Sequence, residues 1–115
     1  MINDIKGIDP KMIANNISSA YPTHPGDILK DEISYRGISQ RKLAERMGLT
    51  YSVLNEILNA RRPITEKTAL LFEAALGIDA EPLMHLQLKY NLQKARNDNK
   101  FLIRLARIKN NAAAL

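Results

Sequence analysis

The segment that most constrains the fold is SQRKLAERMGLTYSVLNEILNARR, which occupies residues 39–62. Ser39 is a preferred N-cap residue, and apolar residues follow it at helical spacing until Gly48, which suits the left-handed end of a helix. Thr50 is a second N-cap and precedes another apolar pattern of helical period. The pattern therefore predicts two short helices joined by a tight turn, at residues 40–47 and 51–58.

This spacing is typical of a helix-turn-helix. That motif needs a small residue where the second helix packs on the first, a glycine in the turn, and apolar residues on the inner face of the second helix. These positions are filled by Ala44, Gly48, Leu54 and Ile57. Together with two caps and a basic exit at Arg61 and Arg62, they favour a DNA-binding motif over a helical hairpin that binds nothing.

The composition limits the class of protein. A chain of 115 residues with 45% hydrophobic residues suits one globular domain. Cysteine is absent, which excludes disulfides and cysteine-based zinc sites. Because no segment approaches the length of a membrane span and the N-terminus lacks a sustained apolar run, we expect a cytoplasmic protein that needs no cofactor and no membrane.

The net charge of +5 is concentrated in two segments. Residues 39–62 carry five basic and two acidic residues, and residues 89–109 carry seven basic and one acidic residue. Residues 63–88, which lie between them, carry one basic and four acidic residues. Binding to a polyanion is consistent with both positive segments, although a lysine-rich helical tail is also explained by solvation alone.

The residues before the motif predict an arm and one helix. Residues 1–23 are interrupted by glycine and proline, so we expect an arm with a short helical turn near Lys11 to Ile17. The domain, residues 24–95, then begins at His24 with a helix that ends at Gly37. Its expected apolar stripe is Ile28, Leu29 and Ile33.

The residues after the motif predict two more helices and an extension. Thr65 caps a fourth helix that ends at Gly77, with Leu70, Leu71, Phe72 and Ala75 inside. A fifth helix follows with Leu83, Leu86, Tyr90 and Leu92 as its apolar positions. Residues 96–115 form a basic extension, which is either a sixth helix or a continuation of the fifth. The predicted fold is all-α, a five-helix domain with an arm and an extension.

The sequence resembles a known family over roughly Tyr21 to Ala95, the HigA type of antitoxin with its relative VapI, within the phage-repressor-like XRE class. The resemblance is carried by HPGDIL at 24–29, GISQ at 37–40, LAERMG at 43–48, ILNARRPIT at 57–65, TA at 68–69, ALG at 75–77 and LQLKYNL at 86–92. The resemblance implies a phage-repressor-like fold and a homodimer that represses its own operon. It also implies a partner, a HigB-type toxin that has the RelE-like fold and cleaves messenger RNA on the ribosome.

Two features depart from the family pattern. An aromatic pair usually precedes the leucine-glutamine of the fifth helix, whereas this chain has Pro82-Leu83-Met84-His85. The arm and the basic extension have no counterpart in the short members. Both departures fall where a partner or a second copy would touch.

The second helix of the motif should enter the major groove, where base edges differ in their donors and acceptors. Tyr51, Ser52 and Asn55 lie opposite its apolar face, with Asn59 and Glu56 at the border. Asn55 suits bidentate pairing with adenine. Gln40 is placed for a phosphate, as in the family, while Arg61 and Arg62 fit either phosphates or carboxylates after Pro63. The candidate DNA-binding residues are Gln40, Arg41, Thr50, Tyr51, Ser52, Asn55, Asn59, Arg61 and Arg62.

Catalysis finds no support in the sequence. His24 and His85 are the two histidines, and neither lies in a context that supplies a nucleophile or an orienting carboxylate. Both are interpreted as capping or surface residues. No phosphate-binding glycine loop or metal-ligand cluster is present in the sequence.

Three functions remain open at this point. The first is a dimeric repressor that acts as an antitoxin, the second a repressor without a toxin, and the third a helical module that binds only protein. In the first case the toxin should dock on acidic residues outside the motif or on the arm before His24, although solubility alone also explains these charges. The leading candidates are Asp27, Asp31 and Glu32 on the first helix, and the others are Glu66, Glu73, Asp79 and Glu81. The dimer surface should include residues among Leu83, Leu86, Tyr90 and Leu92, although some of these must pack in the core of the monomer.

Overall fold

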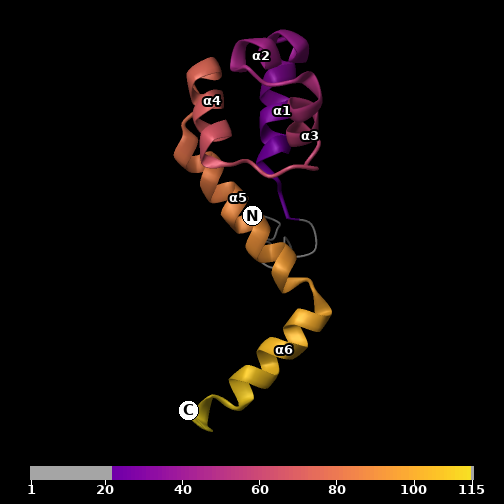
Figure 1. Ribbon diagram of the computed structural model, residues 1–115, viewed down its shortest axis with the longest axis vertical. Helices are drawn as coiled ribbons and strands as arrows, with labels where there is room; N and C mark the ends of the chain where they lie inside the picture. Colours follow the sequence, from indigo (N-terminus) through magenta and orange to yellow (C-terminus); the bar gives the residue numbers. More distant parts are fainter. Residues whose placement is uncertain (1–21, 115) are drawn as a thin grey trace, which may run out of the picture. The chain divides into compact units, whose positions relative to one another are not determined.

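The structure, a computed structural model, describes residues 22–114. Over this range it contains helices and no strand, in agreement with the all-α prediction. The α-helices are α1 (Pro25–Tyr35), α2 (Gln40–Met47), α3 (Tyr51–Leu58), α4 (Glu66–Leu76), α5 (Ala80–Arg96) and α6 (Asn99–Asn110), followed by the 3₁₀ turn η2 (Ala112–Ala114) (Figure 1). The helical turn predicted near Lys11 to Ile17, and nearly all of the predicted arm, lie outside the described residues.

The described chain divides into two units. Residues Thr23–Lys89 form one, which holds α1 to α4 and the first part of α5, and the described residues from Tyr90 onward belong to the other. In the first unit α3 packs against both α1 and α2, and α2 also packs against α4 (Figure 1). The core between these helices includes Leu29, Leu54, Ile57, Leu58 and Phe72, all fully buried.

The helix ends confirm the caps read from the sequence. The backbone N–H groups of Lys42 and Val53 donate to the hydroxyls of Ser39 and Thr50, at 3.3 and 3.1 Å. Thr65 and Thr68 form a capping box at the start of α4. Gly48 and Gly77 end α2 and α4 with φ of 72° and 73°, a conformation that a residue with a side chain rarely adopts. Local chemistry therefore sets the bounds of these helices.

The start of α1 explains the His-Pro-Gly sequence. His24 is the N-cap, and its Nδ1 accepts a hydrogen bond from the backbone N–H of Gly26 at 2.8 Å, so the prediction of a capping histidine is confirmed. A Cβ added to Gly26 would lie 1.9 Å from the carbonyl oxygen of Ile57. Glycine is therefore required for the close approach of α1 to the end of α3.

Two apolar residues predicted to be interior are exposed. Ile28 in α1 is 45% exposed and Leu70 in α4 is 56% exposed. Each lies one residue, or about 100° around the helix, from a position that faces the core. The predicted core positions Leu29 and Ile33 in α1 and Phe72 in α4 are confirmed, and Ala69 and Leu76 are the other buried residues of α4.

A buried amide joins α5 to the loop after α3, and sequence reasoning missed it. Gln87 is 4% exposed, and its Oε1 accepts a hydrogen bond at 2.8 Å from the backbone N–H of Ile64, which is also buried. Glu73 helps to start the same helix, because its carboxylate accepts from the backbone N–H of Ala80 at 3.1 Å. The side chains that fix α5 are thus polar as well as apolar.

Replacing Gln87 with methionine tests the amide. The variant keeps the shape of the side chain but leaves the buried Ile64 N–H without this acceptor, so we expect the free energy of unfolding to fall by about 1–3 kcal/mol. Urea denaturation measures this change. Lys89→Met, on an exposed position of the same helix, is the control and should change stability by about 0.5 kcal/mol or less. Equal effects of the two variants would contradict a stabilising role for the amide.

Ala60 is held in a left-handed conformation, with φ of 61°, at the end of α3. We expect Ala60→Gly to raise the free energy of unfolding by about 0.5–1 kcal/mol, since the relieved strain exceeds the added chain entropy of glycine. Ala74→Gly, at an exposed position inside α4, should lower it by about 1 kcal/mol. Denaturation curves in which both variants lose stability would contradict the assigned strain.

The second unit ends in a separate helix, which decides between the two possibilities left open for the extension. Asp98 is the N-cap of α6, where its carboxylate accepts from the backbone N–H groups of Lys100 and Phe101. Every residue of α6 is exposed, including five large apolar residues. These are Phe101, Leu102, Ile103, Leu105 and Ile108. Over residues 22–114, no helix is long and apolar enough to cross a membrane.

Candidate nucleic-acid interface

The N-terminal turns of α2 and α3 bring together the first group of predicted DNA-binding residues. The guanidinium carbon of Arg41 lies 4.2 Å from the centre of the Tyr51 ring, an arrangement in which the ring attracts the cation. Tyr51 is 38% exposed, and Arg41 and Ser52 are also exposed. A cation, an aromatic ring and a hydroxyl are therefore available to a ligand at one edge of the motif.

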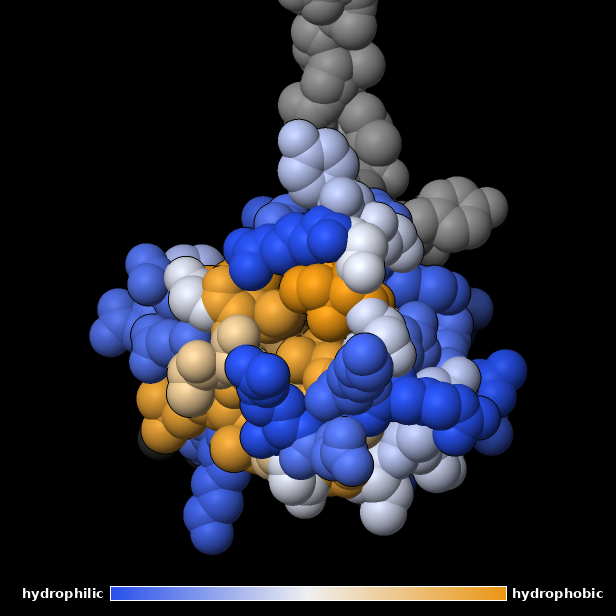
Figure 2. Space-filling model, turned by 90° about the horizontal axis from the view of Figure 1, so that it is seen from above, coloured by the Kyte–Doolittle hydropathy of each residue, from blue (hydrophilic) through white to orange (hydrophobic). Residues whose placement is uncertain are grey.

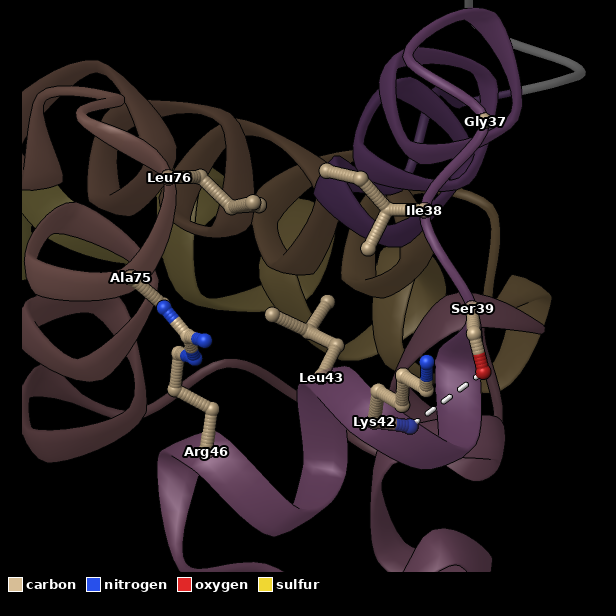
Figure 3. Close-up of a pocket in the computed structure, with 8 residues that line it drawn as sticks. All are labelled: Gly37, Ile38, Ser39, Lys42, Leu43, Arg46, Ala75 and Leu76. Carbon is tan, nitrogen blue, oxygen red and sulfur yellow. Dashed lines mark hydrogen bonds between the residues drawn. The ribbon is translucent and has the colours of Figure 1, made fainter.

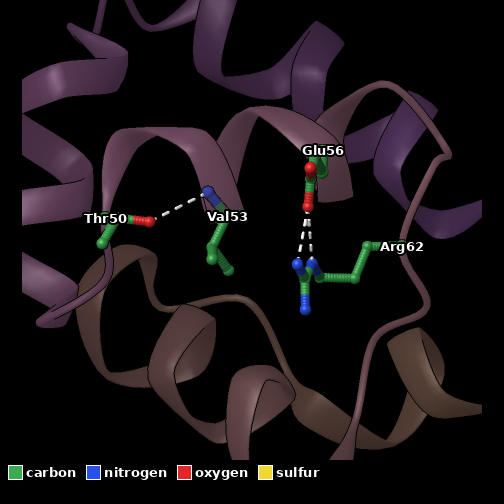
Figure 4. Close-up of polar contacts among 4 residues, drawn as sticks. All are labelled: Thr50, Val53, Glu56 and Arg62. Atoms are coloured by element: carbon green, nitrogen blue, oxygen red, sulfur yellow. Dashed lines mark hydrogen bonds and ion pairs between the residues drawn. The ribbon is translucent and has the colours of Figure 1, made fainter.

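Thr50 and Asn55 are held by their neighbours. Thr50 accepts the cap hydrogen bond from Val53 and keeps its hydroxyl proton to donate (Figure 4). The Nδ2 of Asn55 donates to the Oε1 of Gln40 at 3.4 Å, so the first residue of α2 orients a side chain of α3. The Oδ1 and second amide proton of Asn55 are not used in that bond and can form the paired contacts that adenine offers.

Asn59 is tied to the protein on both sides of its amide. Its Oδ1 accepts from the Nζ of Lys30 at 2.8 Å, and its Nδ2 donates to the backbone carbonyl of Asn55, also at 2.8 Å. These bonds link α1 to the end of α3. The Asn59 amide would have to give up one of these hydrogen bonds before it could form the paired contacts of a base.

The two arginines after α3 differ in their surroundings. Arg62 donates from Nε and Nη2 to the Oε1 of Glu56, at 2.9 and 2.7 Å (Figure 4). Its partner thus lies on α3, whereas sequence reasoning placed the alternative partner after Pro63. Arg61 is exposed and forms no ion pair with a carboxylate among the described residues. Arg61 is therefore more accessible to a phosphate than Arg62.

The acidic candidates for a protein partner lie on α1 and also differ. Asp27 and Asp31 are exposed and form no ion pair within residues 22–114. Glu32 accepts from the Nε of Arg36 at 2.7 Å, and the Nη1 of Arg36 donates to the carbonyl of Leu76 at 2.8 Å. Glu32 consequently helps to fasten α1 to the end of α4.

A metal site has no geometric basis in the part of the chain that the structure describes. Within it, no group of three or more histidine, aspartate or glutamate side chains converges as a metal site would require. His24 is buried as the cap of α1, and His85 is exposed on α5. The chemistry available at the motif is that of hydrogen bonding and charge.

Comparisons with known proteins agree with this geometry. A family model described as helix-turn-helix matches residues 36–83. Virulence-associated protein I of Dichelobacter nodosus is 36% identical over 78 residues, which cover 67% of this chain and 72% of that protein.

Two solved structures extend the similarity. An addiction module antidote protein of the HigA family from Coxiella burnetii is 31% identical with a TM-score of 0.65, over 72% of this chain and 91% of that one. Pseudomonas aeruginosa antitoxin HigA, solved with the higBA promoter, is 31% identical with a TM-score of 0.66, over 71% of this chain and 90% of that one. The region that the family model matches, residues 36–83, includes the whole motif.

Proposed function

Because the chain belongs to the helix-turn-helix family that includes virulence-associated protein I and the HigA-type antitoxins, we propose that it is a DNA-binding antitoxin. It binds an operator in its own promoter as a homodimer and represses its own operon. It also neutralises a small toxin of the RelE-like fold that cleaves messenger RNA. The antitoxin role is supported by the similarity to the antidote protein of the HigA family, and the operator by the similarity to antitoxin HigA, which was solved with the higBA promoter.

One observation carries the DNA-binding part of the proposal. Ser52 is exposed and lies on the side of α3 opposite its buried residues, and the half-buried Asn55 borders that side and is oriented by Gln40. Tyr51 is exposed in the first turn of the same helix. In a helix-turn-helix this side of the second helix faces base edges in the major groove. The surrounding segment, residues 39–62, carries an excess of basic residues that favours binding to phosphates.

A gel shift on the DNA upstream of the chain's own reading frame tests this proposal. We expect a shift on that DNA at protein concentrations that leave a scrambled duplex of equal length unbound. Copurification with the product of the neighbouring gene then separates an antitoxin from a repressor without a toxin. A helical module that binds only protein would shift neither duplex, and that result would overturn the proposal.

The homodimer is proposed to use the exposed apolar residues of α5. Leu83 is buried in the first unit and is not available, whereas Leu88 and Leu92 are 57% and 43% exposed and lie one turn apart. A two-fold dimer would present its two α3 helices to successive major grooves, about 34–36 Å apart. Light scattering at tens of micromolar should give twice the mass of the chain. Leu88→Glu with Leu92→Glu should give the monomer, and a monomeric parent protein would contradict the proposal.

The toxin is proposed to dock on the acidic face of α1. A toxin that acts on messenger RNA needs a basic surface, and Asp27 and Asp31 offer carboxylates free of ion pairs within residues 22–114. Asp31→Lys should weaken toxin binding in calorimetry roughly tenfold, and Asp31→Asn should weaken it less. Operator affinity should remain that of the parent. If Asp31→Lys bound the toxin as tightly as the parent does, the docking surface would lie elsewhere.

A further inference from the structure

A hollow of about 390 Å³ lies beside α2, between the turn that follows α1 and the end of α4. Ile38, Leu43 and Leu76 supply its apolar surface, and Lys42 and Arg46 stand at its border (Figure 3). Figure 2 views this side of the Thr23–Lys89 unit and shows apolar surface around an opening, with hydrophilic side chains about it. The hollow is therefore apolar inside and basic at its edge.

The two cations at the border lack a partner within the described part of the chain. Lys42 and Arg46 are exposed and form no ion pair with a carboxylate of residues 22–114. They stand four residues apart on α2, where like charges repel. Lys42 also lies in the first turn of α2, which has no acidic residue and whose N-terminal dipole disfavours cations. An anion at this border would relieve both effects.

The flank of α2 that carries these cations differs from the flank that carries Arg41. Successive residues of an α-helix are about 100° apart, so Arg46 is about 140° around the axis from Arg41. A phosphate backbone reached by Arg41 would thus not cover Ile38 or Leu76, and its phosphate groups are charged rather than apolar. A ligand that fits must combine an apolar group with negative charge.

We propose that this hollow docks an acidic segment of a partner protein. The segment inserts one leucine or phenylalanine side chain over Ile38, Leu43 and Leu76 and places carboxylates against Lys42 and Arg46. The hollow opens to solvent, as Figure 2 shows, so that a small molecule would leave much of its surface exposed whereas the flanks of a protein segment would cover the opening. This docking does not depend on the acidic face of α1 proposed for the toxin.

The proposal is tested with a defined probe, the peptide acetyl-Glu-Asp-Leu-Phe-Glu-Asp-amide, added to the ¹⁵N-labelled full chain. We expect saturable shifts of the backbone signals of Ile38, Leu43 and Leu76. Lys42→Glu with Arg46→Glu should weaken binding of the peptide at least ~10-fold, because both charges opposite to those of the peptide are lost. Lys67→Glu, an exposed charge change at the other end of α4, should leave its affinity unchanged. Lys42→Gln with Arg46→Gln should reduce the affinity for the peptide by less than the double glutamate variant does. A melting curve checks that this variant is folded.

Four results would overturn the proposal. The first is a peptide with serine in place of leucine and phenylalanine that binds as tightly as the probe. The second is sodium octanoate that binds as tightly as the peptide, which would assign the hollow to small amphiphiles. The third is displacement of the peptide by a scrambled DNA duplex, and the fourth is a set of shifts that leaves the hollow unperturbed. All four are independent of whether the upstream DNA is bound.

Discussion

Gly26→Ala is expected to lower the free energy of unfolding by about 3 kcal/mol or more, because the new methyl group meets backbone atoms that cannot rotate away. The added Cβ would stand 1.9 Å from the carbonyl oxygen of Ile57 and 3.0 Å from its carbonyl carbon. Relief requires α1 to move away from α3, which would also disturb Leu29 and Leu54 in the core between them. The expected effect therefore exceeds that of any surface substitution in this chain.

The sign of this effect makes the prediction decisive. Alanine in place of glycine inside a helix usually stabilises by roughly 0.5–1 kcal/mol, so an intrinsic preference alone predicts the opposite result. Thermal and urea denaturation should show the loss, and Ser34→Ala, at an exposed position of α1, should stay within about 0.5 kcal/mol of the parent. A Gly26→Ala protein as stable as the parent would mean that α1 and α3 are not in the close contact described here.

The same position illustrates what sequence reasoning can recover. The His-Pro-Gly sequence was useful as a mark of family, but its physical cause is a contact between residues 26 and 57, which are far apart in the chain. The caps at Ser39, Thr50 and Thr65 were predictable because each acts within three residues. For the same reason the bounds of α2 and α3 agree with those predicted.

The errors and omissions concern long-range contacts. Apolar character alone does not say which of two adjacent residues faces the core, so Ile28 and Leu70 were placed inside while each lies outside. The hydrogen bonds from Ile64 to Gln87 and from Lys30 to Asn59 join residues 23 and 29 positions apart, and nothing local indicates them. The motif is enough to predict the candidate DNA-binding residues. Only the structure shows that Asn59 and Arg62 already bind other residues of the chain, whereas Ser52 and Arg61 are more accessible.

That separation leads to the second large effect, which concerns operator recognition. Asn55→Ala and Ser52→Ala should each cost about 1–3 kcal/mol of binding free energy on the operator and little on scrambled DNA, because base edges are lost and phosphates are not. Both variants should fold, since neither side chain lies in the core. Gln40→Ala should reproduce part of the Asn55 effect, because it removes the acceptor that orients the Asn55 amide.

The arginines give the matching control. Arg61→Ala should weaken binding to operator and scrambled DNA alike and should lower the salt slope by about one unit, as loss of one phosphate contact requires. Arg62→Ala should lower that slope by less, because the charge of Arg62 is already shared with Glu56 at 2.7 Å. Glu56→Gln would free Arg62 and should strengthen binding to both duplexes, and the Arg62→Ala change should then cost as much as Arg61→Ala. If Asn55→Ala and Ser52→Ala also changed operator and scrambled affinity in parallel, as the arginine variants should, α3 would not be the helix that reads the bases.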